Sequence, residues 1–124
     1  MRRNTAVAVA ALIALAVTPV AISQAGAAQK PVTKTIKVRD NYFSPDRLSV
    51  PKGSRVQWKW PSFGGDVHDV KLRKGPKGVK RFHSALASSD YKYPKRPKRL
   101  TVPGRYVLVC TIHTGMEMTI RVKR

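Results

Sequence analysis

The chain has 124 residues and a formal net charge of +19, with one cysteine and three histidines. This length allows one domain with one hydrophobic core, but not two. The charge implies an anionic partner or surface and salt-dependent association. No nucleic-acid-binding motif is present, and the expected export of the chain also argues against nucleic acid as the partner.

The N-terminal residues have the pattern of a targeting segment. An arginine pair precedes an apolar run over 6–20, and a small-x-small element follows at 25–27. This pattern predicts a signal peptide over 1–27 that is removed on export. The alternative is a retained membrane anchor, which the short apolar run disfavours. We therefore expect 28–124 to form one exported domain, in the periplasm, the cell envelope or the extracellular space.

The remaining sequence alternates between short apolar segments and turns, without a convincing amphipathic helix. Alternation predicts strands at 33–38, 48–50, 55–60, 68–72, 100–102, 105–110 and 118–122. We expect turns at 41–46 and 51–54, a loop at 73–80, a helical turn or irregular structure at 82–93, and a solvated cationic run at 95–99. The fold class predicted is all-β, an antiparallel Greek-key sandwich or barrel.

Strand parity predicts which side chains face the core. In the segment that His68 opens, His68, Val70 and Leu72 point inward, whereas Asp69 and Lys71 point outward. The same parity places Val56, Trp58, Trp60, Tyr106, Leu108, Cys110, Met118, Ile120 and Val122 in the core.

The single cysteine is the most informative residue. Cys110 cannot form an intramolecular disulfide, and a free thiol is a liability in an oxidising compartment, so metal ligation is attractive. His113 and Met116 follow at three-residue intervals, and His68 offers a second imidazole. A thiolate, two imidazoles and a thioether are the donor set of a blue copper site. The alternatives are a buried free thiol, a loop histidine and a core methionine.

The segments around these residues resemble those of the cupredoxins, and most closely the amicyanin and plastocyanin branch. The resemblance extends over 33–124. It rests on Phe-Ser-Pro at 43–45, Leu-Ser-Val-Pro-Lys-Gly at 48–53, His-Asp-Val at 68–70 and the segment 103–116. It implies one type 1 copper ion held by His68, Cys110, His113 and Met116, and transfer of single electrons between extracytoplasmic redox partners. It also implies a monomer that is not an enzyme and has no catalytic residues.

Two methionines compete for the axial ligand position. In the family, the last strand has inward-facing apolar residues four and six positions after the axial methionine. From Met116 these are Ile120 and Val122, whereas from Met118 the second would be Arg124. The resemblance therefore favours Met116.

The residue after the first histidine departs from the family pattern. Related proteins have an asparagine there that ties the two ligand loops together, and this chain has Asp69. We expect Asp69 to bond Thr111 and its charge to favour Cu(II), which lowers the reduction potential. His83 is expected to be exposed and structural.

The sequence is also compatible with other functions. Copper storage or delivery would use the same four ligands, with faster metal release. A metal-free module that binds acidic polymers would explain the charge alone, and a cysteine hydrolase has little support because no oxyanion-hole motif is evident. Zinc at the site would be adventitious, because a thioether is a poor zinc ligand. The partners expected are redox proteins with acidic docking surfaces, with electrostatic contact to an anionic envelope as a further option.

Overall fold

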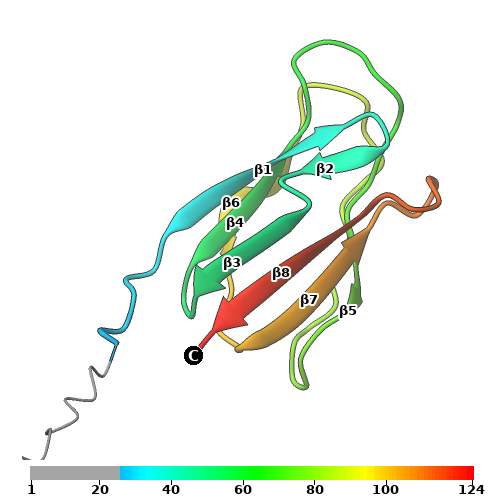
Figure 1. Ribbon diagram of the computed structural model, residues 1–124. Coiled ribbons are helices and arrows are strands. Elements are labelled where there is room, and N and C mark those ends of the chain that lie inside the picture. Colours follow the sequence, from blue (N-terminus) through cyan, green and yellow to red (C-terminus); the bar gives the residue numbers. More distant parts are fainter. Residues whose placement is uncertain (1–25) are drawn as a thin grey trace, which may run out of the picture.

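The computed structural model describes residues 26–124 (Figure 1). The predicted signal peptide lies almost wholly outside the described residues, so that assignment stays a prediction. The strands are β1 (Thr33–Arg39), β2 (Tyr42–Ser44), β3 (Arg47–Pro51), β4 (Arg55–Lys59), β5 (Lys71–Lys74), β6 (Lys92–Arg99), β7 (Gly104–Val109) and β8 (Glu117–Lys123).

These strands form two four-stranded sheets, in the orders β2-β1-β4-β6 and β3-β8-β7-β5. The two sheets lie face to face in Figure 1, and the buried apolar side chains between them form one hydrophobic core, so the predicted all-β sandwich is confirmed. Residues 26–124 contain no helix long and apolar enough to cross a membrane.

The core is built by the parity that the sequence predicts. Val56, Trp58 and Trp60 from the β4 segment are at most 2% exposed. Met118, Ile120 and Val122 of β8 and Tyr106 and Leu108 of β7 are equally buried. Alternate side chains of a strand point to one face, so each sheet contributes one apolar face to the core.

Most strand pairs are antiparallel, as predicted, but two are parallel. β1 pairs with β4 and β3 pairs with β8 in parallel register. The cause is the connection β1-β2-β3-β4, in which β3 joins the second sheet and β4 returns to the first. Consecutive strands therefore do not all pair with each other, and each sheet contains both orientations.

The cationic run at 95–99 is the segment whose observed structure differs most from the predicted one. Residues 92–99 form the edge strand β6, which pairs with β4, and 100–102 form no strand. An edge strand tolerates proline and lysine because one of its sides faces solvent. The half-buried Tyr93 packs against the hydrophobic core. Elsewhere, 42–44 form β2 within the expected turn. β5, at 71–74, begins in the expected strand 68–72 and extends into the expected loop, and 82–91 are irregular without a helix.

Candidate metal centre

The first histidine lies in a connection between the sheets. His68 precedes β5, which begins only at Lys71, so His68 does not open a regular strand. The backbone of His68 instead exchanges two hydrogen bonds with Ala87, of 2.9 and 3.0 Å. This bridge fixes the backbone of His68, and the His68 side chain is only 2% exposed.

The other candidate ligands come from one tight loop between β7 and β8. The Cys110 N–H donates to the Met116 carbonyl at 3.0 Å, and the Met116 N–H donates to the His113 carbonyl at 3.2 Å. Gly115 has a φ of 84°, a left-handed conformation that favours glycine and lets the loop close within so few residues. The loop thus holds three potential donor residues at one end of the sandwich.

Three donor atoms converge there. The Nδ1 atoms of His68 and His113 lie 3.1 Å apart, and the Cys110 Sγ lies 3.9 Å and 3.5 Å from them, respectively. Metal–nitrogen bonds of about 2.0 Å and metal–sulfur bonds of about 2.3 Å, about 120° apart, separate such atoms by roughly 3.5–3.7 Å. The three donors can therefore bind one metal ion without a change in backbone path.

Asp40 orients the buried imidazole. Its Oδ1 lies 3.2 Å from the His68 Nε2 and also accepts the Asp66 N–H at 3.0 Å. The hydrogen bond from His68, followed by that from Asp66, lowers the pKa of Asp40, so this carboxyl is ionised at neutral pH. An ionised carboxylate on Nε2 favours a proton there and leaves Nδ1 free as a ligand, as carboxylate–histidine pairs do in metal sites.

Asp69 ties the two ligand segments together, although the prediction that it points outward is wrong. Its side chain is 1% exposed. It accepts the Thr111 N–H at 2.6 Å, the Thr111 hydroxyl at 2.5 Å and the His83 Nε2–H at 2.6 Å. Burial raises the pKa of Asp69, but the hydrogen bonds from Thr111 and His83 outweigh burial, and the net pKa is lowered. The expected Asp69–Thr111 bond is therefore confirmed, and it fixes the residue next to Cys110.

The two methionines have different surroundings. Both are buried, at 2% exposure for Met116 and 1% for Met118. The Sδ of Met118 accepts a hydrogen bond from the Trp58 Nε1–H at 3.3 Å, in the core between the sheets. Met116 belongs to the loop that holds Cys110 and His113, which agrees with the choice of Met116 as axial ligand. Its role as a ligand stays a prediction.

His113 lies at the molecular surface and is partly exposed. A hollow of about 420 Å³ adjoins it and is also lined by Lys71, Arg73 and Arg81. Most of the exposed large apolar side chains are on the loops at this end, including Phe63 at 86% and Ile112 at 51%. His113 is thus the most exposed of the three donor residues.

The sequence pattern predicted the residues that meet at the site, but it did not predict two residues that hydrogen-bond around them. His68, Cys110 and His113 are brought together. Asp40 gave no signal, because it lies 28 positions before His68 and follows an ordinary strand. His83 was expected to be exposed and structural; its side chain is 48% exposed, but it also contacts the buried Asp69.

Comparisons with known proteins support the fold. No family sequence model and no curated protein sequence matches the chain. Among solved structures, a copper-containing nitrite reductase (NirK) from Thermus scotoductus SA-01 is similar, with a TM-score of 0.60 and 27% identity. That match covers 86% of this chain but only 25% of the reductase, so the chain corresponds to about a quarter of that protein's length.

Amicyanin structures match over more of their own length. A reduced amicyanin variant has a TM-score of 0.60 and 20% identity, over 72% of this chain and 80% of that chain. A reduced Cu(I) form of another amicyanin variant has a TM-score of 0.59 and 20% identity, over 80% and 88%, respectively. At these identities the likeness establishes the fold, and the chain has a cupredoxin-like fold.

Proposed function

We propose that the protein is an exported blue copper protein that binds one copper ion and carries single electrons between redox partners. The observation that carries this proposal is the convergence of one thiol sulfur and two imidazole Nδ1 atoms within 3.9 Å of one another, at one end of a cupredoxin-like sandwich. Met116 would complete the set as a weak axial ligand. A thiolate–imidazole–thioether set is typical of electron-transfer copper sites.

When bound, copper would supply a one-electron couple, and the protein's own residues perform the remaining tasks. Asp40 holds the His68 ring, and Asp69 holds Thr111 beside Cys110, so the donors keep their positions in either redox state. The core around His68 and Cys110 excludes water. His113 links the buried donors to the surface, and it is the only one of the three that is partly exposed. We assign it the role of electron exit.

The copper-site end also has features suited to brief contact with another protein. Phe63, Val67 and Ile112 are exposed there, and Lys71 lies beside the ligand loop. Apolar side chains with nearby cations fit a partner that has an acidic rim around an apolar centre. We therefore keep redox proteins with acidic docking surfaces as the proposed partners, and a monomeric state for this protein.

The test is the absorption spectrum of the copper-loaded protein. We expect an intense visible thiolate-to-copper charge-transfer band that disappears in Cys110→Ser, because only the thiolate produces it. The matched control is Ser84→Ala, which changes a buried hydroxyl outside the donor set and should keep the band. A colourless copper-loaded wild-type protein would refute the proposal.

Metal exchange separates a carrier from a copper-delivery protein. A carrier should retain copper through repeated cycles of reduction and oxidation in the presence of a competing chelator. Rapid loss of Cu(I) to the chelator, with the visible band present in the oxidised state, would favour delivery instead.

A further inference from the structure

The charges of this protein are separated along the sandwich. All six acidic residues lie within the described part, and all are at or near the end that holds the candidate metal centre. Asp40 and Asp69 contact the site directly, and Glu117 pairs across strands with Val109, beside Cys110. Three hydrogen bonds place the other acidic residues at the same end. The Asp46 carbonyl accepts the Thr119 N–H, the Asp66 N–H donates to the Asp40 carboxylate, and the Asp90 N–H donates to the Pro61 carbonyl.

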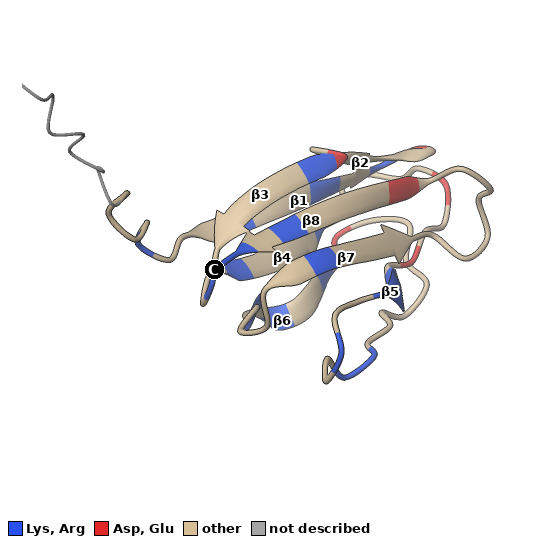
Figure 2. Cartoon of the chain, turned by 60° about the horizontal axis from the view of Figure 1, so that its bottom comes forward, with Lys and Arg blue, Asp and Glu red and all other residues tan. Residues whose placement is uncertain are grey.

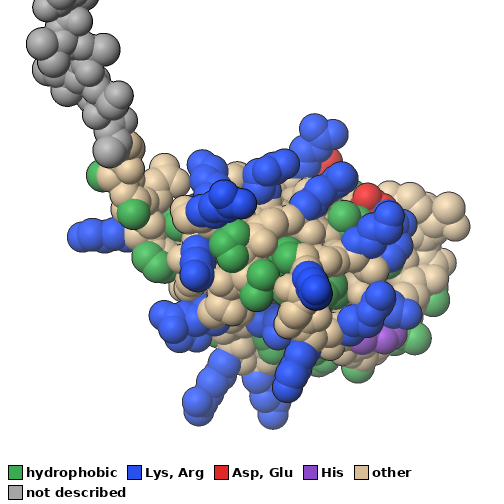
Figure 3. All heavy atoms as spheres, turned by 90° about the horizontal axis from the view of Figure 1, so that it is seen from below, with side chains coloured by type: hydrophobic (Ala, Val, Ile, Leu, Met, Phe, Trp, Pro, Cys, Tyr) green, Lys and Arg blue, Asp and Glu red, His purple; other side chains and the backbone are tan. Residues whose placement is uncertain are grey.

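The opposite end carries only positive charge, and we call it the cationic end. Its members are exposed side chains from the strand termini and turns farthest from Cys110: Lys52, Arg55, Lys77, Lys80, Arg99, Arg105, Arg121 and Lys123. None of them forms a salt bridge with any residue of 26–124. Figure 3 shows the molecule from this end. Lysine and arginine side chains (blue) project all over the visible surface, and acidic side chains (red) appear only at its margin.

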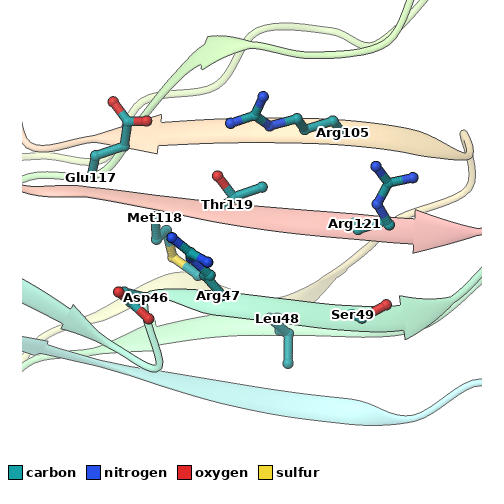
Figure 4. Close-up of a pocket in the computed structure, with 9 residues that line it drawn as sticks. All are labelled: Asp46, Arg47, Leu48, Ser49, Arg105, Glu117, Met118, Thr119 and Arg121. Atoms are coloured by element: carbon teal, nitrogen blue, oxygen red, sulfur yellow. The ribbon is translucent and has the colours of Figure 1, made fainter.

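The separation is visible along a single groove. A hollow of about 740 Å³ runs over the outer face of β3, β8 and β7. In Figure 4 the carboxylates of Asp46 and Glu117 lie at one end of it, with Arg47 beside Asp46. Arg105 and Arg121 lie toward the other end, where no carboxylate lines the hollow. Figure 2 shows the same trend over residues 26–124, with red confined to the part of the sandwich away from the C-terminus.

The cationic end also includes like charges placed side by side. Arg55 of β4 pairs directly with Arg99 of β6, and Arg105 of β7 pairs directly with Arg121 of β8. Like charges in directly opposed positions destabilise a sheet. Folding alone therefore does not favour this arrangement, and an external anion would offset its cost.

The exposed large apolar side chains gather at the metal end, opposite to the cationic end. Of the large apolar residues exposed in 26–124, only Val32, at 39%, is at the cationic end. Tyr42, Phe63, Val67, Leu86 and Ile112 are on segments at the metal end. The metal end thus suits protein contact, whereas the cationic end offers charge without an apolar anchor, which suits a broad anionic surface.

We propose that the cationic end docks on an anionic lipid bilayer and directs the metal end away from it. This orientation rests on the proposed electron-transfer function, because it leaves His113 free for a partner. The path of the chain agrees with it: Thr33, the first residue of β1, pairs with Arg55, so the segment 26–32, which carries the exposed Lys30, joins the domain at the cationic end. An anionic membrane attracts each nearby lysine or arginine with roughly a fivefold gain in partitioning.

The test is co-sedimentation of the copper-loaded protein, purified after export, with vesicles that contain anionic phosphatidylglycerol. Neutral phosphatidylcholine vesicles report any binding through other segments. The test variant Lys52→Gln/Arg99→Gln/Arg121→Gln/Lys123→Gln removes four of the eight positive charges of the cationic end. The matched control Lys37→Gln/Lys59→Gln/Lys71→Gln/Lys92→Gln removes the same charge nearer the metal end.

We expect the wild-type protein to bind only the anionic vesicles, and this binding to weaken as salt is added. The affinity for these vesicles should fall at least about a hundredfold in the test variant and less than about tenfold in the control. Equal losses in the two variants would overturn the docking face. Absent vesicle binding, with retention on an acidic polymer such as polyglutamate, would overturn the lipid as occupant. The visible copper band is read on the same samples, so a failed copper site is distinguished from a failed membrane contact.

Discussion

Met116 and Met118 are two residues apart, are equally buried and have different neighbours. Because they are on the same face of the chain as it enters β8, parity alone does not separate them. The hydrogen bond from the Trp58 indole to the Met118 sulfur does so, since it gives Met118 a structural partner in the core.

Substitution of the methionines should therefore give different results. Met116→Leu is expected to change the charge-transfer spectrum and raise the reduction potential, with little effect on folding. Met118→Leu should leave the spectrum unchanged and cost about 1–3 kcal/mol, because the buried Trp58 N–H loses its acceptor. Spectra, potentiometry and urea unfolding of both variants provide the measurement. A spectral change in Met118→Leu alone would reverse the assignment.

The charge of Asp69 is the second feature at the residue scale. A buried carboxylate near the metal favours the more positive oxidation state. At an effective dielectric constant of about 20, the energy of one such charge is about 4 kcal/mol at a separation of roughly 4 Å and falls as the separation grows, so the effect is at most roughly 170 mV. Asp69→Asn should therefore raise the reduction potential. An unchanged or lower potential would contradict this reasoning, and Thr111→Ser, which keeps both donor groups, is the control.

At the scale of elements, the corner that leads into β7 is stabilised by Tyr106. The tyrosine is 2% exposed, and its hydroxyl donates to the Val102 carbonyl at 2.7 Å. This bond to the backbone four residues upstream has the pattern of a tyrosine corner. It holds the chain as it passes from the sheet of β6 to the sheet of β7.

The same residue predicts a pH dependence. Burial raises the pKa of Tyr106 above its ordinary value of 10.0. The folded state then binds this proton more tightly than the unfolded state, so the contribution to stability is complete below pH 10 and falls as pH rises through the folded pKa. Tyr106→Phe should cost about 1 kcal/mol at pH 7 and show a weaker decline above pH 10. Denaturant unfolding at pH 7 to 11 tests this, and parallel declines would contradict it.

The edge strand β6 illustrates what local patterns fail to report. Its sequence reads as a solvated cationic run with two internal prolines, yet it pairs with β4 through a register shift between Val56 and Trp58. The backbone hydrogen bonds and the half-burial of Tyr93 come from the neighbouring strand, which is distant in sequence. Propensity arguments omit such a neighbour.

At the scale of the whole molecule, a net charge of +19 against six acidic residues should oppose folding through self-repulsion. Raising NaCl from 10 to 300 mM shortens the screening length from about 30 Å to less than 8 Å. We expect a rise in the unfolding temperature of about 5 °C, equivalent to roughly 1 kcal/mol. The Lys52→Gln/Arg99→Gln/Arg121→Gln/Lys123→Gln variant should show a smaller rise, and equal shifts in calorimetry would contradict this account.

The sequence by itself determined the fold class, most of the core and the convergence of His68, Cys110 and His113. Period-two alternation reports burial, and the spacing of Cys110 and His113 is set by a single short loop. Tertiary structure decided the parallel pairings, the strand β6, the roles of Asp40 and His83, and the separation of charge between the two ends. Each of these depends on segments that are far apart in the chain and meet only when the two sheets pack together, so no local pattern encodes them.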